Sequence, residues 1–498
     1  MYRSAGWLGF LFSAFLLSSV VGDLEDVVFV VVSQSHPLHS AIAEHKKYFW
    51  RESLVQLTKN APTILLTHEA WAPSGAWTIA PLFPVLSKGF ATAKWFFFAS
   101  EETEVDFRKL EKVLERYDFK QPLFLGHALW DTQPTILHHY APASRGEALL
   151  YPHFPSGWLL SSPLLHKAAS VIHKFNPNFN IDSQYELASF LKYMSSLDAM
   201  SFFPEAPPMS KDGTLLTHVP ELCMADEEEG TSHSCATSCP QRTSGRAPVD
   251  LSAVWFAVKT CEKYHHTRLP VLTQTWGHDA AGSIGYYSDV EDPAYSTSSI
   301  GVPNTEQGHC GKTMAIIYKF SRDFPHRQWL VIVDDDTLLS VRRLVEVLGS
   351  YNASVPTLMG EVYGYKAHLG GDGSAYVTGG GGMVLSRAAV SSLVEVGYQC
   401  PHDSYPDDMF LGTVAKQLGM YIVHSTAFHQ AQPRDYPTST LMTKAAISFH
   451  RHQPQDPFAI YKEHLMEPRR VSSPPDGTKP MTSPPPDISK FHQRSYEL

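Results

Sequence analysis

The sequence predicts an α/β fold made of two tandem domains, the second of which repeats the first. Short runs of β-branched and aromatic residues alternate with helical segments, a pattern typical of layered α/β proteins. The stretches Lys94–Thr103 (KWFFFASEET) and Gln328–Thr337 (QWLVIVDDDT) align at an offset of 234 residues. A segment rich in proline and acidic residues lies between the two copies and marks their boundary.

Length and composition indicate a multidomain globular protein. The chain has 498 residues, of which 43% are hydrophobic and 18% are charged, and this length suits two or three domains. Its formal net charge is −10 and no basic stripe offsets the acids, so we expect no nucleic-acid binding. An acidic protein can still bind an anionic ligand when a metal ion supplies the positive charge.

Residues 1–22 have the features of a targeting segment. Arg3 precedes a mostly apolar run from Trp7 to Val21, which predicts either a signal peptide or a signal-anchor. A strand-like run starts at Val27 and leaves almost no stem, so cleavage is favoured, and we expect membrane attachment only if the segment stays uncleaved. Six cysteines suit the oxidising secretory pathway, but their pairing cannot be deduced from the sequence.

Residues 27–203 form the first predicted domain. Val27–Ser33 and Thr63–Thr67 are expected to be strands, joined by a helical stretch that reaches about Lys59. Lys94–Ala99 is a third predicted strand, and a helix with apolar spacing through Leu110 follows it. Further matches between the halves support the duplication: Trp50 with Trp276, Gly126 with Gly360, and Gly157–Ser161 with Gly382–Ser386.

The remaining boundaries follow from composition. Residues 204–250 contain Pro204, Pro207 and Pro208 and are predicted to be a linker, with the second domain at 251–465. Residues 466–498 are rich in proline and serine and are expected to be a disordered tail. The chain ends in Ser-Tyr-Glu-Leu, whose last two residues match a KDEL-type signal and point to the endoplasmic reticulum.

Three consecutive aspartates, Asp334–Asp336, follow the apolar run Trp329–Val333. A strand that ends there presents the acids at a sheet edge, and clustered carboxylates repel one another unless a cation lies between them. Oxygen ligands of this kind suit Mg²⁺ or Mn²⁺. The alternative is a polar turn of solvated or helix-capping acids. The first copy has Ser100–Glu102 at these positions, so we expect that copy to have lost catalysis and kept its scaffold.

Two further features suit a nucleotide site. Val254–Thr260 is a predicted strand, so Thr260 and the aspartates should emerge at one carboxyl edge of the sheet. Arg268 could pair with a diphosphate through its planar guanidinium, or could lie on a solvated helix surface. The four glycines Gly379–Gly382 are costly to order and suit a backbone that approaches a ligand closely, with a hairpin tip as the alternative.

Two acids and a histidine complete the candidate site. In Pro406-Asp407-Asp408, one aspartate is a candidate helix N-cap and the other could be a general base. His429 follows a strand-like stretch, Tyr421–His424, and would make sense as a metal ligand that completes the aspartate site.

The ordered set VKTC, RLPVLTQTW, DDDT, GGGG, PDD and FHQ resembles the fringe-type family of metal-dependent β-1,3-glycosyltransferases over roughly Val254–Pro454. Each motif is weak alone, whereas their order is highly specific. The resemblance implies a GT-A fold, with the first domain a degenerate GT-A-like copy. The doubled architecture and Glu-Leu ending are similar to family members that use UDP-glucose to extend O-linked fucose on thrombospondin type 1 repeats in the endoplasmic reticulum lumen.

The resemblance also implies Mn²⁺ as the metal and a role for each motif residue. The implied roles are metal binding by Asp336 and His429, donor binding by Thr260, Arg268, Asp335, Gly380 and Gly381, and proton acceptance by Asp408 as the catalytic base. Fringe enzymes transfer N-acetylglucosamine, so the family alone leaves the donor sugar open.

Two other functions remain open at this point. A metal-dependent phosphohydrolase would use the aspartate cluster with a second cation and a water nucleophile, but it has no use for the glycine and PDD motifs. A lumenal lectin or folding factor would bind fucosylated repeats without turnover, and the intact acidic motifs of the second copy argue against it.

Overall fold

The computed structural model describes residues 24–70, 79–131, 135, 137, 149–175, 179–198, 215–223, 235–238, 247–366, 374–451 and 455–466. The targeting segment at 1–22, Cys239 and the predicted tail beyond Met466 lie outside these residues. Within the described ranges, the helices are all too short or too polar to cross a membrane.

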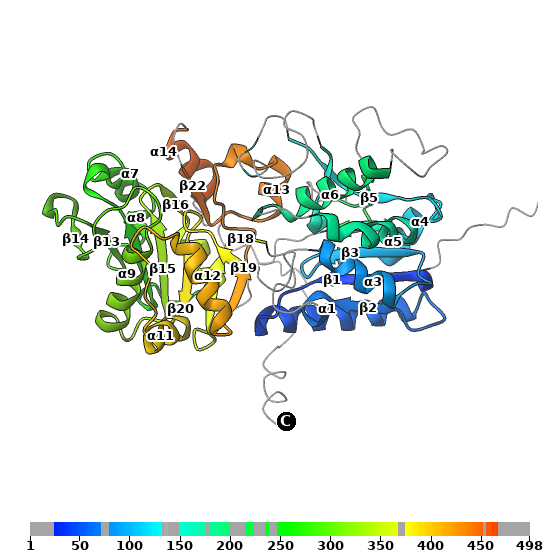
Figure 1. Ribbon diagram of the computed structural model, residues 1–498, viewed down its shortest axis with the longest axis horizontal. Helices are drawn as coiled ribbons and strands as arrows, with labels where there is room; N and C mark the ends of the chain where they lie inside the picture. The colour runs from blue at the N-terminus through cyan, green and yellow to red at the C-terminus, as the bar shows by residue number, and fades with distance from the viewer. Residues whose placement is uncertain are drawn as a thin grey trace, which may run out of the picture.

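The first domain is built on a six-stranded sheet of order β10-β5-β8-β3-β1-β2. Its strands are β1 (Val27–Val32), β2 (Thr63–Leu66), β3 (Trp95–Ser100), β5 (Phe124–Gly126), β8 (Trp158–Ser161) and β10 (Leu216–His218). β1 pairs in parallel with β2 and β3, whereas β8 is antiparallel to both β3 and β5. Figure 1 shows this sheet in the blue-to-teal half of the molecule.

The second domain has a seven-stranded sheet of order β14-β13-β12-β15-β20-β17-β21. Its strands are β12 (Val254–Lys259), β13 (Ile284–Ser288), β14 (Thr297–Ser299), β15 (Trp329–Asp334), β17 (Thr357–Gly360), β20 (Met383–Ser386) and β21 (Tyr421–His424). β12 is parallel to β13 and β15, and β20 is antiparallel to β15 and β17.

Apart from the extra edge strand β14, the two sheets have the same order and the same strand directions. The registers also correspond, because Val27 pairs with Trp95 in the first sheet and Val254 pairs with Trp329 in the second. The predicted fold of two tandem α/β copies is therefore confirmed.

Strand alternation explains why helices cover both faces of each sheet. In the second domain, alternate residues of β12 and β15 pack against α7 (Leu269–Gln274), α8 (Trp276–Asp279) and α10 (Val341–Leu348). The intervening residues pack against α9 (Cys310–Asp323), α11 (Arg387–Val396) and α12 (Asp407–Gln417). The strands are thus buried on both sides, and polar chemistry is confined to their ends.

The first domain has the same layers. One sheet face packs on α1 (Pro37–Val55) and α4 (Phe107–Leu114), and the other on α3 (Phe83–Gly89), α5 (Ser162–Val171) and α6 (Ser183–Asp198). Shorter helices are α2 (Thr67–Ala70), α13 (Thr438–Thr443) and α14 (Pro457–Ile460). The small ladders are β4 (Glu104–Val105) with β11 (Thr237–Ser238), β6 (Ala128–Leu129) with β7 (Tyr151–Pro152), and β16 (Thr337–Leu339) with β22 (Ser448–His450).

The predicted linker at 204–250 is wrong over Leu216–His218. This segment is β10, which pairs in parallel with β5 and completes the first sheet. Only Leu216 is buried there, while the next two residues are exposed. So short an edge strand leaves no apolar run in the sequence, and its pairing depends on a neighbour far away in the chain.

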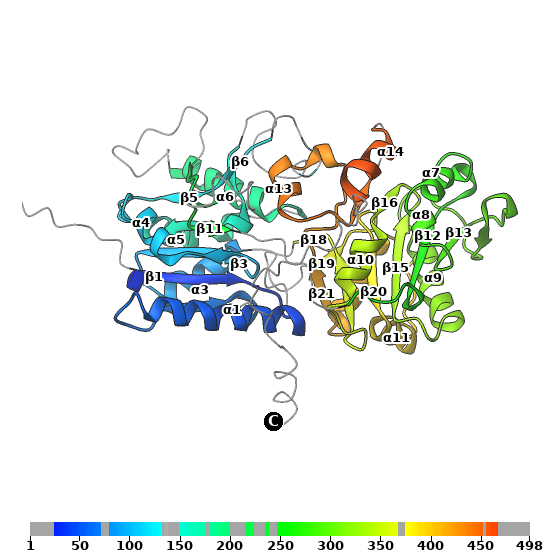
Figure 2. The ribbon, with the colours of Figure 1, turned by 180° about the vertical axis from the view of Figure 1, so that it is seen from behind.

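The two domains are joined by backbone pairing and by polar contacts. β9 (Phe179–Asn180) of the first domain pairs antiparallel with β18 (Val362–Tyr365) of the second, beside β19 (Ser374–Val377). Gln34 and His424 exchange two hydrogen bonds, Nε2 to carbonyl at 3.0 Å and backbone N–H to Oε1 at 2.8 Å. Figure 2 shows the two sheets side by side, with α13 between them.

Candidate active site

A cluster of two carboxylates and an imidazole lies at the end of β15. Asp334 is the last residue of that strand, and Asp336 follows in the turn that leads into β16. β16 pairs antiparallel with β22, with Thr337 opposite His450, so this ladder brings His450 beside the aspartates. His450 Nε2 lies 3.1 Å from Asp336 Oδ1 and 3.8 Å from Asp334 Oδ2.

The chemistry of this cluster fits a divalent cation. One ligand atom from each of Asp334, Asp336 and His450 lies within 4.8 Å of the others. Carboxylate oxygens with one imidazole nitrogen suit Mn²⁺. Burial alone would lower the pKa of His450, but its hydrogen bond to Asp336 and the charges of Asp336 and Asp334 outweigh burial and raise that pKa. The acids therefore attract positive charge to this point.

His450 is oriented from behind by Gln430. The Nδ1 atom of His450 lies 3.1 Å from the Gln430 carbonyl oxygen, so Nδ1 is the atom that carries the proton in a neutral ring. The Nε2 lone pair is then directed at the aspartates. Backbone bonding of this kind usually fixes the tautomer of a metal-binding histidine.

The glycine run passes directly over the His450 ring. A Cβ atom on Gly380 would lie 2.3 Å from His450 Nδ1, so only glycine fits there. Thr337 Oγ1 donates to the Gly380 carbonyl at 2.8 Å, and Gly381 N–H donates to Gln430 Oε1, also at 2.8 Å. The structure thus explains the glycines by close packing of backbone against the cluster, and contact of Gly380 and Gly381 with a donor remains a prediction.

His429 does not lie in the candidate metal cluster of Asp334, Asp336 and His450, which corrects the sequence-based assignment. Its Nδ1 is 3.0 Å from the Ser448 carbonyl oxygen, and its ring stacks on Phe449 at a centroid distance of 4.6 Å. Burial lowers the pKa of His429 to about 4, so the ring is neutral. Phe449 and His450 are neighbours in β22 and point to opposite sides of the strand, and His429 packs on the side away from the cluster.

Of the FHQ motif, Gln430 is the residue that contacts the candidate site, through hydrogen bonds to Gly381 and His450. The second domain contains two Phe-His pairs, at 428–429 and 449–450, and either could have supplied the ligand. Only the β16–β22 ladder shows which of them meets the aspartates.

Asp335 lies between the two residues predicted to line the nucleotide site. Thr260 Oγ1 donates to Asp335 Oδ2 at 2.7 Å, and Arg268 Nη1 lies 2.5 Å from Oδ1 of the same carboxylate. Arg268 also reaches Asp336 Oδ2 at 3.2 Å and stacks over the ring of Tyr264. Burial raises the pKa of Asp335 although Arg268 opposes the shift. The structure therefore brings Thr260, Arg268 and Asp335 together as expected.

Lys259 is a site residue that the sequence reasoning missed. Its buried Nζ lies 3.1 Å from Asp334 Oδ1 and 2.6 Å from Asp407 Oδ2. Thr313 Oγ1 donates to the same Asp407 oxygen at 2.6 Å. The first copy offers a signal that could have found Lys259, because Val32 pairs there with Ser100 where Lys259 pairs with Asp334.

Asp407 and Asp408 have different environments. The N-cap position of α12 is Pro406, so neither acid caps the helix, and Asp407 is neutralised by Lys259 instead. Asp408 is half-buried, and its Oδ1 accepts the Met409 N–H at 2.7 Å. Burial, followed by the charge of Asp407, raises the pKa of Asp408 to about 6. A carboxylate with this pKa suits a general base near neutral pH.

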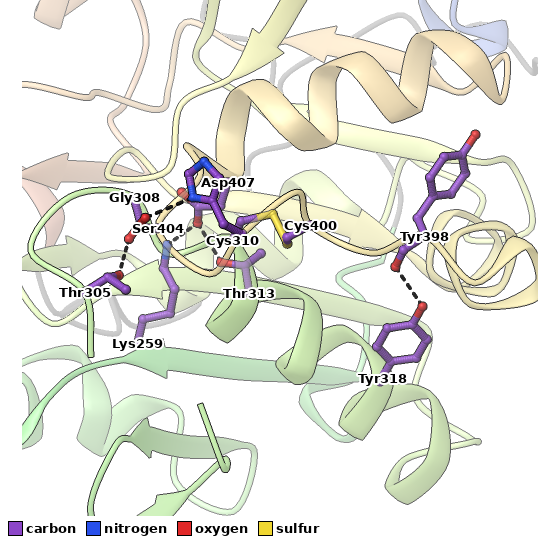
Figure 3. The surroundings of a disulfide bond; sticks show 11 residues. Lys259, Thr305, Gly308, Cys310, Thr313, Tyr318, Tyr398, Cys400, Ser404 and Asp407 are labelled. Carbon is purple, nitrogen blue, oxygen red and sulfur yellow. Dashed lines mark hydrogen bonds and ion pairs between the residues drawn. A yellow bond between two sulfur atoms is a disulfide. The ribbon is translucent and has the colours of Figure 1, made fainter. Parts of the chain in front are cut away.

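A disulfide fixes the segment that precedes these acids. Cys310 and Cys400 are bonded with a Cα–Cα distance of 5.9 Å, which links the first turn of α9 to the loop before α12. Cys310 N–H also donates to the Tyr405 carbonyl at 3.1 Å. Figure 3 shows Asp407 directed at Thr313 and Lys259 beside this disulfide. The second disulfide joins Cys223 to Cys235, and Cys261 is a buried free thiol.

The equivalent edge of the first copy faces the second domain. Glu101 forms a hydrogen bond with His39 Nδ1, and His39 Nε2 lies 2.7 Å from the Tyr351 hydroxyl of the second domain. Glu102 lies 2.9 Å from Lys444 Nζ, also across the interface. The carboxylates at the positions of Asp335 and Asp336 thus serve interdomain contacts.

Comparisons with known proteins identify related chains. A family model described as Fringe-like matches residues 249–472. The Beta-1,3-glucosyltransferase of Homo sapiens is 40% identical over 446 residues, which cover 88% of this chain and 84% of that protein. The Fringe glycosyltransferase of Drosophila melanogaster is 28% identical over 213 residues, which cover 38% of this chain and 50% of that one. A solved structure of a glycosyltransferase involved in glycosylation of the PBCV-1 major capsid is 13% identical to this chain. The match covers 43% of this chain and 99% of that one. Its TM-score of 0.27 is too low for a fold comparison.

The doubled α/β fold and these matches define a glycosyltransferase whose second domain carries the Asp-Asp-His cluster and the nearby acidic pair. Its similarity to the human and mouse enzymes extends over most of both chains. The chain belongs to the fringe-type β-1,3-glucosyltransferase family, and the resemblance seen in its motifs is confirmed.

Proposed function

We propose that this protein moves glucose from UDP-glucose to the 3-hydroxyl of O-linked fucose on thrombospondin type 1 repeats, with Mn²⁺ as its metal, in the endoplasmic reticulum lumen. The proposal rests on the contact that Lys259 makes between the candidate metal cluster and the acidic pair Asp407-Asp408. Lys259 contacts Asp334 and Asp407 at once, so the cluster at the end of β15 and the acids that begin α12 belong to one site. That arrangement supports a sugar transfer between a metal-bound donor and a base.

Asp334, Asp336 and His450 would hold the cation. When bound, the cation offsets the negative charge of the diphosphate leaving group. Arg268 orients Asp335 and adds positive charge on the nucleotide side, and Thr260 holds the other oxygen of Asp335. These contacts would orient the donor beside the cation.

Asp408 would accept the proton of the fucose 3-hydroxyl. Its neighbour Asp407 is neutralised by Lys259, so Asp408 is the acid of the pair that stays available. Attack by the hydroxyl oxygen on the anomeric carbon breaks the bond to UDP in a single displacement. An α-linked donor then gives a β1→3 product. Correct placement of the two sugars supplies much of the rate.

The first copy would act as a scaffold and not as a second active site. In the first copy, Val32 stands at the position of Lys259 and Ser100 at the position of Asp334. The strand ends of the first copy therefore lack the buried ammonium and the first carboxylate of the second copy.

A donor panel tests the proposal. Purified protein is incubated with a fucosylated thrombospondin repeat, Mn²⁺ and one of UDP-glucose, UDP-N-acetylglucosamine or UDP-galactose, and the product linkage is read by NMR. We expect β1→3 glucose transfer that EDTA removes. Transfer of N-acetylglucosamine would instead support a fringe-like donor, since the radical fringe relative of Gallus gallus is named a β-1,3-N-acetylglucosaminyltransferase. Binding of the repeat without transfer of any sugar would refute the proposed transferase activity.

A further inference from the structure

One buried acid has no part in the mechanism above. Glu361 lies between β17 and β18, with only 9% of its surface exposed. Burial raises its pKa to about 8 although two hydrogen bonds oppose the shift, so the side chain is mostly neutral at pH 7. The ionisable groups around it are Asp182 of the first domain, Tyr363 and Tyr436. A buried acid of this kind needs an explanation.

Glu361 holds two segments of the site in place. Its Oε2 accepts the backbone N–H of Gln430, and the Tyr436 hydroxyl lies 3.2 Å from the same oxygen. The Glu361 backbone carbonyl accepts the N–H of Thr378 at 2.9 Å, immediately before the glycine run. One residue thus fixes the start of the glycine run and the loop opposite it.

Gln430 links Glu361 to the candidate metal site through two further hydrogen bonds. Its side-chain Oε1 accepts the Gly381 N–H at 2.8 Å, and its carbonyl oxygen lies 3.1 Å from His450 Nδ1. A shift of the Gln430 backbone would therefore tilt the His450 ring and displace Gly381 together. Both changes would alter the direction of His450 Nε2.

We propose that Glu361 is a positioning residue for the candidate metal site and acts through Gln430 on His450 and Gly381. The inference rests on the proposed function, because it assigns His450 to the metal. It adds a residue whose side chain reaches the site only through Gln430. Removal of such an outer-shell partner typically costs about 10–100-fold in metal affinity.

The test compares Glu361→Ala with Glu361→Gln. Glutamine keeps the acceptor oxygen and the shape of the neutral acid, whereas alanine removes both. We expect Glu361→Ala to weaken Mn²⁺ binding about tenfold or more, as read by the EPR signal of free Mn²⁺. Glu361→Gln should stay within about threefold of the parent protein. Equal Mn²⁺ affinity in the alanine variant, or equal loss in both variants, overturns the proposal.

Hydrogen exchange gives a readout that needs no metal. The amides of Gln430 and Gly381 should exchange faster in Glu361→Ala and keep their protection in Glu361→Gln. If the parent protein binds no Mn²⁺, the proposed metal site fails, while the exchange data still decide whether Glu361 holds these amides. If Glu361→Ala does not fold, Glu361→Met removes both acceptor oxygens with little change of volume. Unchanged exchange at both amides in that variant then overturns the proposal.

Discussion

Lys259 Nζ lies 2.6 Å from Asp407 Oδ2, which joins the end of β12 to the first turn of α12 inside the second domain. The same ammonium lies 3.1 Å from Asp334 Oδ1. Burial alone would lower the pKa of Lys259, but the two carboxylates outweigh it and raise that pKa. One buried cation therefore holds together the two acidic motifs on which the proposed chemistry depends.

Replacing this lysine should be strongly destabilising. In Lys259→Met the buried Asp407 carboxylate loses its countercharge, and we expect a loss of about 3–5 kcal/mol in the free energy of unfolding, measured in urea. Lys319→Met is the matched control, since Lys319 pairs with Asp323 on the exposed side of α9 and should cost about 0–1 kcal/mol. Adding Asp407→Asn to Lys259→Met should restore part of the loss, and a double variant no better than the single one would contradict this account.

Asp408→Asn separates catalysis from donor binding. Transfer should disappear while UDP binding, followed by calorimetry, stays within about twofold, because Asp408 is not among the candidate metal ligands. In the parent protein kcat/KM should fall below about pH 6 as Asp408 becomes protonated. Glucose transfer that survives in Asp408→Asn would refute the base assignment.

The same variant should change stability with a predictable sign. The pKa of Asp408 is higher in the folded chain, so the folded state favours its protonated form and loses this advantage as pH rises through about 6. Because asparagine is neutral at every pH, Asp408→Asn should unfold at a higher temperature than the parent protein at pH 7.5. The difference should shrink toward pH 4. A gap that widens in acid would contradict the stated environment of Asp408.

His450 and His429 can be distinguished by substitution. His450→Ala removes a candidate ligand and should weaken Mn²⁺ binding by about tenfold or more. His429→Phe keeps a ring stacked against Phe449 and should leave Mn²⁺ affinity within about threefold. It should lower stability, because the Ser448 carbonyl loses the partner that His429 Nδ1 provides. Titration of each variant with Mn²⁺ decides the matter. The reverse order of effects would restore the assignment made from sequence.

Gly380→Ala tests the contact between the glycine run and His450, the candidate ligand. The added Cβ would lie 2.3 Å from the His450 ring, so the ring must move and Mn²⁺ affinity should fall. Gly379→Ala is the matched control, because its nearest neighbours are 3.9 Å away, and it should fold and bind Mn²⁺ like the parent protein. Equal Mn²⁺ affinity in the two variants would show that His450 is not confined in this way.

Much of the fold could be predicted because its strands carry a strong local signal. Val254–Lys259, Trp329–Asp334 and Trp95–Ser100 are buried on both faces and appear in the sequence as continuous apolar runs. The repeat at an offset of 234 residues then predicted two copies. β10 was missed because its three residues carry no such run and depend on pairing with β5.

The sequence by itself determined the α/β layers, the doubled architecture and the order of motifs that places the chain in its family, because each of these depends on short local patterns and on their order along the chain. The tertiary structure alone decided that His450 and not His429 joins the aspartates, and that Lys259 neutralises Asp407. Those contacts join residues far apart in sequence, and they depend on strand register, which no local pattern contains.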